Sequence, residues 1–184
     1  MEYCYLENHL KYEGLQLQSH WAYKNYGLEG DSIVAFQGPC HVPLPEMVDL
    51  EDVKDKADIY SENMLHFIVE HFHLQLEKAI FKQRLLICII KESIERESSI
   101  KLLRQGDDLY LGVKKLTVSI ATLSPVSCLI HAGVNVSSEN TPVPAVGLKE
   151  IGIDSYFLGH EVMKEYIKEL KEIKKARSKV RGVF

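Results

Sequence analysis

The stretch from residue 102 to residue 136 constrains the fold most, because it alternates short β-rich runs with turn signals. The runs are rich in Val, Ile, Thr and Tyr, which fit strands better than helices. Ser124 and Pro125 separate two of the runs at a spacing typical of a β-hairpin. We therefore predict strands over 108–111, 115–122 and 126–136.

Helical patterns flank this stretch on both sides. Apolar residues recur at three- and four-residue steps over 57–72, 76–96 and 155–176, which predicts three helices. Helices and antiparallel strands occupying separate regions of the chain indicate an α+β fold. We expect a single mixed, mostly antiparallel sheet with the helices packed on one face.

The N-terminal part of the chain carries weaker signals. Residues 31–36 read as a short buried strand between two glycines. Residues 38–45 contain three prolines and a glycine, which predicts a loop because proline removes backbone donors. Residues 49–58 contain five acidic residues and are expected to lie on the surface.

Composition limits the class of protein. The 184 residues suit one domain over residues 1–184, and 46% hydrophobic with 26% charged residues is typical of globular proteins. A net charge of −4 argues against a general nucleic-acid binder. The longest apolar run in the middle of the chain, Leu85 to Ile90, is too short to cross a bilayer, and residues 1–15 show no secretion signal. A cytoplasmic protein without membrane contact is expected.

The cysteines and histidines do not predict a metal site. The 4 cysteines form no CxxC pair, so reduced thiols are expected. Among the 8 histidines, His66, His71 and His73 cluster beside Glu70, yet no HExxH spacing occurs and no third ligand shares the face of His66 and Glu70. Solvated or core-edge histidines are the favoured interpretation.

The C-terminal region is basic. From about residue 155 we expect a basic helix and tail, and residues 161–184 hold eight Lys or Arg against four Glu. Positive charges at the end of a helix complement its dipole. A solvated helix end followed by a frayed tail is the favoured interpretation, and a phosphate or RNA contact is the alternative.

Residues 104–136 carry the most informative motifs. Asp107, Asp108 and Leu109 are followed by Lys114, Lys115 and Leu116, and then by the sequence AGVNV at 132–136. This series resembles the core signature of the biotin and lipoate protein ligases. The resemblance implies a ligase-like, class II synthetase-like fold and an enzyme acting on a small carboxylic acid, with ATP and magnesium as its cofactors if it forms an adenylate.

The resemblance also implies roles for the motif residues. Lys115 would be the catalytic electrostatic centre, because an ammonium stabilises both a carboxylate and a phosphate. Asp108 or Asp107 would orient that ammonium or help to hold magnesium. Asn135 would fix a turn or hydrogen-bond a ligand.

Other polar residues are candidates for contacts with a ligand. Arg104 is able to clamp an anion bidentately. His131 is either a satisfied core histidine or a base beside Lys115. Trp21 either packs in the core or forms one wall of a pocket, with hydrogen bonds from its neighbours. These candidates are Gln18, His20, Trp21, Gly38, Arg104 and His131.

The chain as a whole, over most of residues 12–181, resembles an uncharacterised and mainly archaeal family of unknown function. It departs from the ligases in two respects: Val118 stands where they have a small residue, and no glycine-rich phosphate loop precedes the motifs. A ligase- or acyltransferase-like enzyme is one hypothesis, and a non-catalytic small-ligand-binding protein is the alternative. An RNA-associated protein is a weaker one, and a homodimer is left open.

Overall fold

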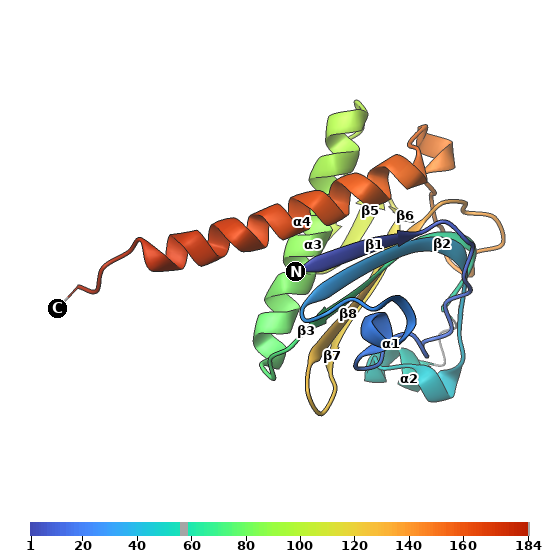
Figure 1. Ribbon diagram of the computed structural model, residues 1–184. Helices are drawn as coiled ribbons and strands as arrows, with labels where there is room; N and C mark the ends of the chain where they lie inside the picture. Colours follow the sequence, from blue (N-terminus) through green and yellow to red (C-terminus); the bar gives the residue numbers. More distant parts are fainter. Residues whose placement is uncertain (56–58, 184) are drawn as a thin grey trace.

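The computed structural model describes residues 1–55 and 59–183 and is built on a five-stranded sheet (Figure 1). The strand order is β1-β2-β3-β8-β7, and only β1 and β2 run parallel. The strands are β1 (Glu2–Leu6), β2 (Ser32–Val42), β3 (Ile59–His71), β7 (Thr117–Leu123) and β8 (Cys128–Asn135). This confirms the predicted α+β fold with one mixed, mostly antiparallel main sheet.

The two long helices pack on one face of the sheet, as predicted. They are α3 (Leu76–Glu97) and α4 (Ser155–Ser178), and their apolar sides form the larger core with inward-facing residues such as Leu65 and Phe67 of β3. The C-terminal end of α4 projects away from the rest of the molecule (Figure 1). Both helices begin and end within two residues of the predicted limits.

A smaller core lies on the other face of the sheet. Trp21 and Ala22 of α1 (Trp21–Tyr26) pack there against Phe36 of β2 and Met64 of β3. Two short helices, η1 (Leu44–Glu46) and α2 (Leu50–Asp55), follow β2. This side is thinly covered, which leaves room for a cavity.

A separate three-stranded sheet, in the order β4-β5-β6, precedes β7. Its strands are β4 (Leu103–Gln105), β5 (Asp108–Leu111) and β6 (Lys114–Lys115). The predicted strand over 108–111 is therefore confirmed, and the one predicted over 115–122 is divided between β6 and β7. The short sheet carries the lysine and aspartate motifs to the edge of the main sheet.

The helix predicted over 57–72 is wrong, because this segment forms β3. It is the central strand, and residues alternate between the larger core and the smaller one, so that Met64 to His71 are all buried. A strand buried on both faces gives a continuous apolar run, which short periodicity windows do not distinguish from a helix. Residues 56–58 lie outside the described part of the chain.

The loop predicted over 38–45 is also wrong in part, because β2 continues to Val42. The register with β3 shifts between Gly38 and Cys40, so Pro39 sits at an irregularity where the ladder needs no donor from it. The remaining residues form η1 and its flanking turns. The acidic segment that follows η1 contains α2 and is largely exposed, as expected for a surface segment.

No helix within the described ranges combines the length and the apolar character that a membrane span requires.

Candidate functional site

A cavity of about 430 Å³ opens on the face of the sheet opposite α3 and α4. Its walls come from β7 and β8, from the small sheet, from the 141–145 loop and from the segment after β2. The polar lining residues include Tyr12, Asp107, Asp108, Lys115, Ser119, His131 and Asn135. Five of the predicted site residues, Asp107, Asp108, Lys115, His131 and Asn135, are therefore brought together at one cavity.

Lys115 is held firmly at this cavity. Its backbone N–H donates to the carbonyl of Pro144 at 2.9 Å, and its carbonyl accepts from Val146 at 3.0 Å. Its ammonium nitrogen lies 2.7 Å from Oδ2 of Asp108, with the two side chains 30% and 23% exposed. The result is a positioned charge that still reaches the cavity.

Burial raises the pKa of Asp108, and the hydrogen bond and charge of Lys115 oppose that rise. The carboxylate therefore depends on the neighbouring ammonium for its ionised form. In turn it orients the ammonium, as the motif resemblance implied.

Asp107 has a structural partner on the other side of the sheet. Its Oδ2 accepts from Nε2 of Gln83 at 2.7 Å and from Oγ of Ser119 at 3.1 Å. These bonds tie the small sheet to α3 and β7. Asp107 thus fixes the position of Asp108 and Lys115 through the backbone as well as lining the cavity.

His131 lies in a chain of buried hydrogen bonds. Its Nε2 is 3.1 Å from Nδ1 of His66, whose Nε2 is 3.2 Å from the carbonyl oxygen of Gly38. The ring of Tyr12 stacks on His131 with 3.8 Å between centroids. Burial lowers the pKa of His66 to about 3 and that of His131 well below its ordinary value, so both rings are neutral.

Asn135 ends β8 beside the motif lysine. Its Nδ2 donates to the carbonyl of Lys115 at 3.4 Å, and its backbone N–H donates to Leu116 at 2.9 Å. The amide therefore helps to hold the backbone of β6 at Lys115. Its side chain also lines the cavity.

The remaining predicted residues do not line the cavity. The guanidinium of Arg104 donates to the carbonyl of Gly106 in its own hairpin, and Nε2 of the exposed Gln18 donates to Leu15 at 2.7 Å. His20 offers its backbone N–H to the carboxylate of Glu70 at 2.9 Å, in a left-handed conformation. Trp21 packs in the smaller core.

Gly38 contributes to the site through its carbonyl and through close packing. That carbonyl oxygen lies 3.2 Å from Nε2 of His66 and anchors its ring. A Cβ at this position would lie 2.2 Å from the carbonyl oxygen of Leu10. The glycine is thus required by the segment that runs alongside β2.

Sequence reasoning missed the acidic side of the cavity. The segment after β2 contributes Glu46, Asp49, Glu51 and Asp52 to the lining. Their clustering in sequence was a signal, but acids that are close together usually face water. Sequence reasoning also missed Tyr12 and the role of His66, because neither belongs to a local motif.

The residues present do not fit a nucleoside triphosphate. Lys115 is the one lysine or arginine in the described lining, against six carboxylate residues. Within residues 1–55 and 59–183, no three His, Cys, Asp or Glu residues are arranged to hold a metal ion.

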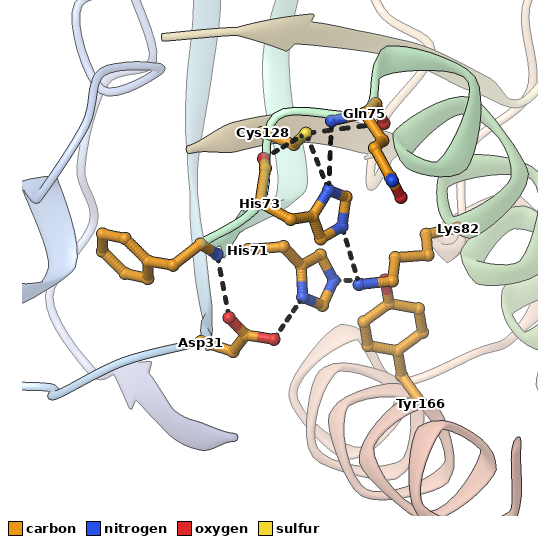
Figure 2. A network of polar contacts seen from close by, with 8 residues as sticks. Asp31, His71, His73, Gln75, Lys82, Cys128 and Tyr166 are labelled. Atoms are coloured by element: carbon orange, nitrogen blue, oxygen red, sulfur yellow. Dashed lines mark hydrogen bonds and ion pairs between the residues drawn. The ribbon is translucent and has the colours of Figure 1, made fainter. Parts of the chain in front are cut away.

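A second polar cluster lies at the opposite end of β3 (Figure 2). Asp31 accepts from Nδ1 of His71 at 2.8 Å, and Nε2 of that ring is 3.0 Å from the Tyr166 hydroxyl of α4. These contacts tie the end of the sheet to α4. The cluster thus closes the larger core where the chain turns from β3 into α3.

The neighbouring part of this cluster joins α3 to β8. Nε2 of His73 is 3.1 Å from the ammonium nitrogen of Lys82, and its Nδ1 is 3.2 Å from Sγ of Cys128 (Figure 2). Burial raises the pKa of the Cys128 thiol, which favours its protonated form. Burial and nearby lysines lower the pKa of His73 to about 4. The contacts of His73 thus hold the start of α3 against β8.

Comparison with solved structures bears on the fold. Biotin and lipoate protein ligases share it. One of them, the biotin protein ligase from Aquifex aeolicus in complex with biotin and ATP, has a TM-score of 0.62 and 15% identity, covering 95% of this chain and 72% of the other. The predicted ligase-like architecture is confirmed at the level of the fold.

Two archaeal relatives are much more similar. The uncharacterized protein MJ0805 of Methanocaldococcus jannaschii is 40% identical over 182 residues, which cover 95% of this chain and 82% of the relative. A protein of unknown function from Pyrococcus horikoshi has a TM-score of 0.92 and 39% identity, covering 99% and 100% of the two chains. Since the sequence model of the domain of unknown function DUF366 also matches residues 1–181, the chain belongs to the DUF366 family.

Proposed function

We propose that the cavity binds a small organic acid whose carboxylate pairs with the ammonium of Lys115. The observation that carries this proposal is the position of Lys115, fixed by its own backbone bonds and by Asp108 at 2.7 Å. A cation that is already held in place loses little freedom when a ligand arrives. The similarity of the fold to ligases that act on organic acids supports the same class of ligand.

The rest of the lining suits an organic acid with a substantial apolar body. Apolar side chains from several elements face the cavity, among them Val42, Met47, Met64, Val118 and Ile120. Such walls favour a hydrocarbon or ring system, with a few polar groups fixing its orientation. The Asp and Glu side chains of the lining repel an anion at other positions in the cavity, so the carboxylate of the ligand is expected to lie at Lys115.

Binding of straight-chain carboxylic acids such as octanoic acid, measured by calorimetry and thermal shift, tests the proposal. The substitution Lys115→Ala should weaken binding by roughly tenfold or more, because a charge-assisted hydrogen bond is lost. Lys114→Ala is the matched control, since this neighbouring lysine is exposed and does not line the cavity. Equal affinity in the wild type and the Lys115→Ala variant would contradict the assignment.

A ligase- or acyltransferase-like reaction is the second candidate function. It is favoured by the same ion pair, because a fixed ammonium can stabilise the charge that develops on an acyl group. Arg104 does not support it, since its guanidinium is occupied in its own hairpin.

Pyrophosphate exchange with ATP, magnesium and each acid that binds tests the ligase form of this reaction. Exchange that disappears in the Lys115→Ala variant would support a ligase. Binding without exchange would reject formation of an adenylate.

A further inference from the structure

The inner wall of the cavity contains polar atoms that the rest of the fold does not use. His131 and Tyr12 line the cavity and are only 4% and 3% exposed. Among the described residues, neither Nδ1 of His131 nor the hydroxyl of Tyr12 has a hydrogen-bond partner. Both residues line the cavity, so these two polar atoms are available to a ligand that enters it.

The hydrogen-bond chain determines which ring nitrogens carry protons. The carbonyl oxygen of Gly38 only accepts, so Nε2 of His66 must donate to it. In a neutral ring the other nitrogen is then an acceptor, so Nδ1 of His66 accepts a hydrogen bond from the N–H at Nε2 of His131. Nδ1 of His131 consequently carries no proton and can only accept a hydrogen bond. The carbonyl of Gly38 fixes this state, because it sets the tautomer of His66 and His66 in turn sets that of His131.

The stacked rings keep this acceptor in a fixed direction. Tyr12 stacks on His131, and Phe36 stacks on His66 with 4.9 Å between centroids. The strands beneath them pair along their full length, so the rings have little freedom to turn. The ring of His131 therefore offers a ligand a hydrogen-bond acceptor and no donor.

The acceptor lies at a distance from the anion-binding end. Asn135 contacts Lys115, and His131 precedes Asn135 by four residues on the same face of β8. At about 3.3 Å per residue, the backbone positions of His131 and Asn135 are separated by roughly 13 Å along the strand. One ligand of moderate length can reach from Lys115 to His131.

We propose that the His66–His131 pair, with Tyr12 beside it, determines ligand specificity by selecting a hydrogen-bond donor at the end of the ligand remote from its carboxylate. This inference rests on the proposed function for the position of the carboxylate. The preferred ligands are organic acids that carry a distal O–H or N–H group. Acids with an all-hydrocarbon tail leave Nδ1 of His131 unpaired and bind more weakly.

Two acids of equal chain length provide the test: ω-hydroxyoctanoic acid, which has a distal donor, and nonanoic acid, which has none. Calorimetry gives the ratio of the affinities of the hydroxy acid and nonanoic acid for each protein. This ratio should be roughly tenfold higher in the wild-type protein than in His131→Phe, which keeps an aromatic ring against Tyr12 but lacks the acceptor. His9→Gln, at an exposed histidine, is the control and should give the wild-type ratio.

A second variant and a direct measurement guard against misfolding of the first. His66→Phe removes the group that locks His131 and should reduce the preference without removing the acceptor ring. Heteronuclear NMR of the histidine ring nitrogens in the wild-type protein should show Nδ1 of His131 unprotonated near neutral pH. A protonated Nδ1 would overturn the inference whatever the variants do.

The outcomes separate this inference from the proposed function. Acids that bind through Lys115 with the same hydroxy-to-methyl ratio in wild type and His131→Phe would overturn the inference alone. If no acid binds, a neutral donor, ethyleneurea, is the remaining probe. Its binding, lost in His131→Phe, would retain the inference and reject the organic acid. Failure of both kinds of probe would overturn both proposals.

Discussion

At Gly38, two segments of backbone approach more closely than any side chain would permit. The N–H of Leu10 donates to the carbonyl of Gln37 at 3.0 Å, and the N–H of Tyr12 donates to Pro39 at 2.9 Å. The segment therefore runs alongside β2 and carries Tyr12 over His131. The absence of a side chain at Gly38 thus allows Tyr12 to take its place in the wall of the cavity.

The substitution Gly38→Ala should destabilise the protein by about 3 kcal/mol, because its Cβ would meet backbone atoms that cannot move independently. Gly112→Ala is the control: its Cβ would meet no atom, and its positive φ costs about 1–2 kcal/mol. Urea unfolding of both variants gives the comparison. A smaller loss in Gly38→Ala than in the control would contradict the close approach.

The ion pair at the site illustrates how single residues gain their properties from neighbours. Lys115 and Asp108 come from adjacent strands of a hairpin and meet at 2.7 Å. Asp107 holds that hairpin against α3 through Gln83. Local motifs identified the pair correctly as neighbours, and the anchoring helix was not evident from them.

Among the elements, β3 shows why periodicity alone misleads. Its residues contribute alternately to two cores, so Leu65 and Phe67 face α3 and α4 while Met64 and Ile68 face α1. A strand exposed on one face would alternate apolar and polar residues, and this one does not. Its identity as a strand follows from the second core, which residues far along the chain supply.

The element with the least contact to the fold is the last part of α4. Tyr166 and Ile167 are buried in the larger core, whereas residues 171–183 are exposed. The charges of this part form pairs such as Lys175 with Glu172 at 2.5 Å, which lie on the surface and contribute little. The last turns of α4 therefore extend beyond the part of the helix that packs on the sheet.

Deletion of residues 174–184 should change the free energy of unfolding by no more than about 0.5 kcal/mol, since exposed positions without special contacts contribute little. Deletion from residue 166 removes Tyr166 and its bond to His71, and it should prevent stable folding. Circular dichroism with thermal melting distinguishes the two. A large loss of stability in the shorter deletion would show that the tail has a partner in the fold.

The same shorter deletion tests the RNA hypothesis. Residues 174–181 hold several exposed basic side chains. If they contact RNA, the wild-type protein should be retained on immobilised RNA with a steep dependence on salt, and the deletion variant should not. Equal retention of both forms would reject the tail as a phosphate contact.

At the scale of the whole molecule, stability should depend strongly on pH. Burial keeps His66 and His131 neutral, and it lowers the pKa of His71 as well. In the unfolded chain these histidines titrate near pH 6.5. Below that pH the unfolded state binds more protons than the folded state, so stability falls as the pH decreases.

The sign for Asp31 is the same. Burial by itself would raise the pKa of Asp31, but the hydrogen bonds from His71 and from the backbone of Phe72, together with nearby positive charge, outweigh it and lower the pKa in the folded state. Its contribution is present above its ordinary value of about 3.9 and is lost as the pH falls further. The histidines therefore govern the range from about pH 6.5 downward, and Asp31 adds to the loss at stronger acid.

Urea midpoints between pH 7.5 and pH 5 should fall by an amount equivalent to about 2 kcal/mol or more, the value for one fully buried neutral histidine over that range. The control substitution His9→Gln should not change this slope. Midpoints that stay constant over the range would show that the buried histidines are charged or become solvated.

The sequence by itself determined the elements whose signals are local. The hairpin region from residue 108 to residue 135, both long helices and the neighbourhood of Lys115 and Asp108 follow from propensity, periodicity and short motifs. Those motifs also led to the correct fold, through their resemblance to the core signature of the biotin and lipoate protein ligases. Chain-neighbouring residues are sufficient for inferences of this kind.

Only the tertiary structure decided what faces the cavity. The His66–His131 pair, the carbonyl of Gly38 and the ring of Tyr12 come from distant positions in the sequence and meet through strand pairing. The same packing turned Arg104 and Gln18 away from the cavity and buried Trp21 in the smaller core. A side chain's surroundings depend on strand register and on contacts across the sheet, which no local pattern encodes.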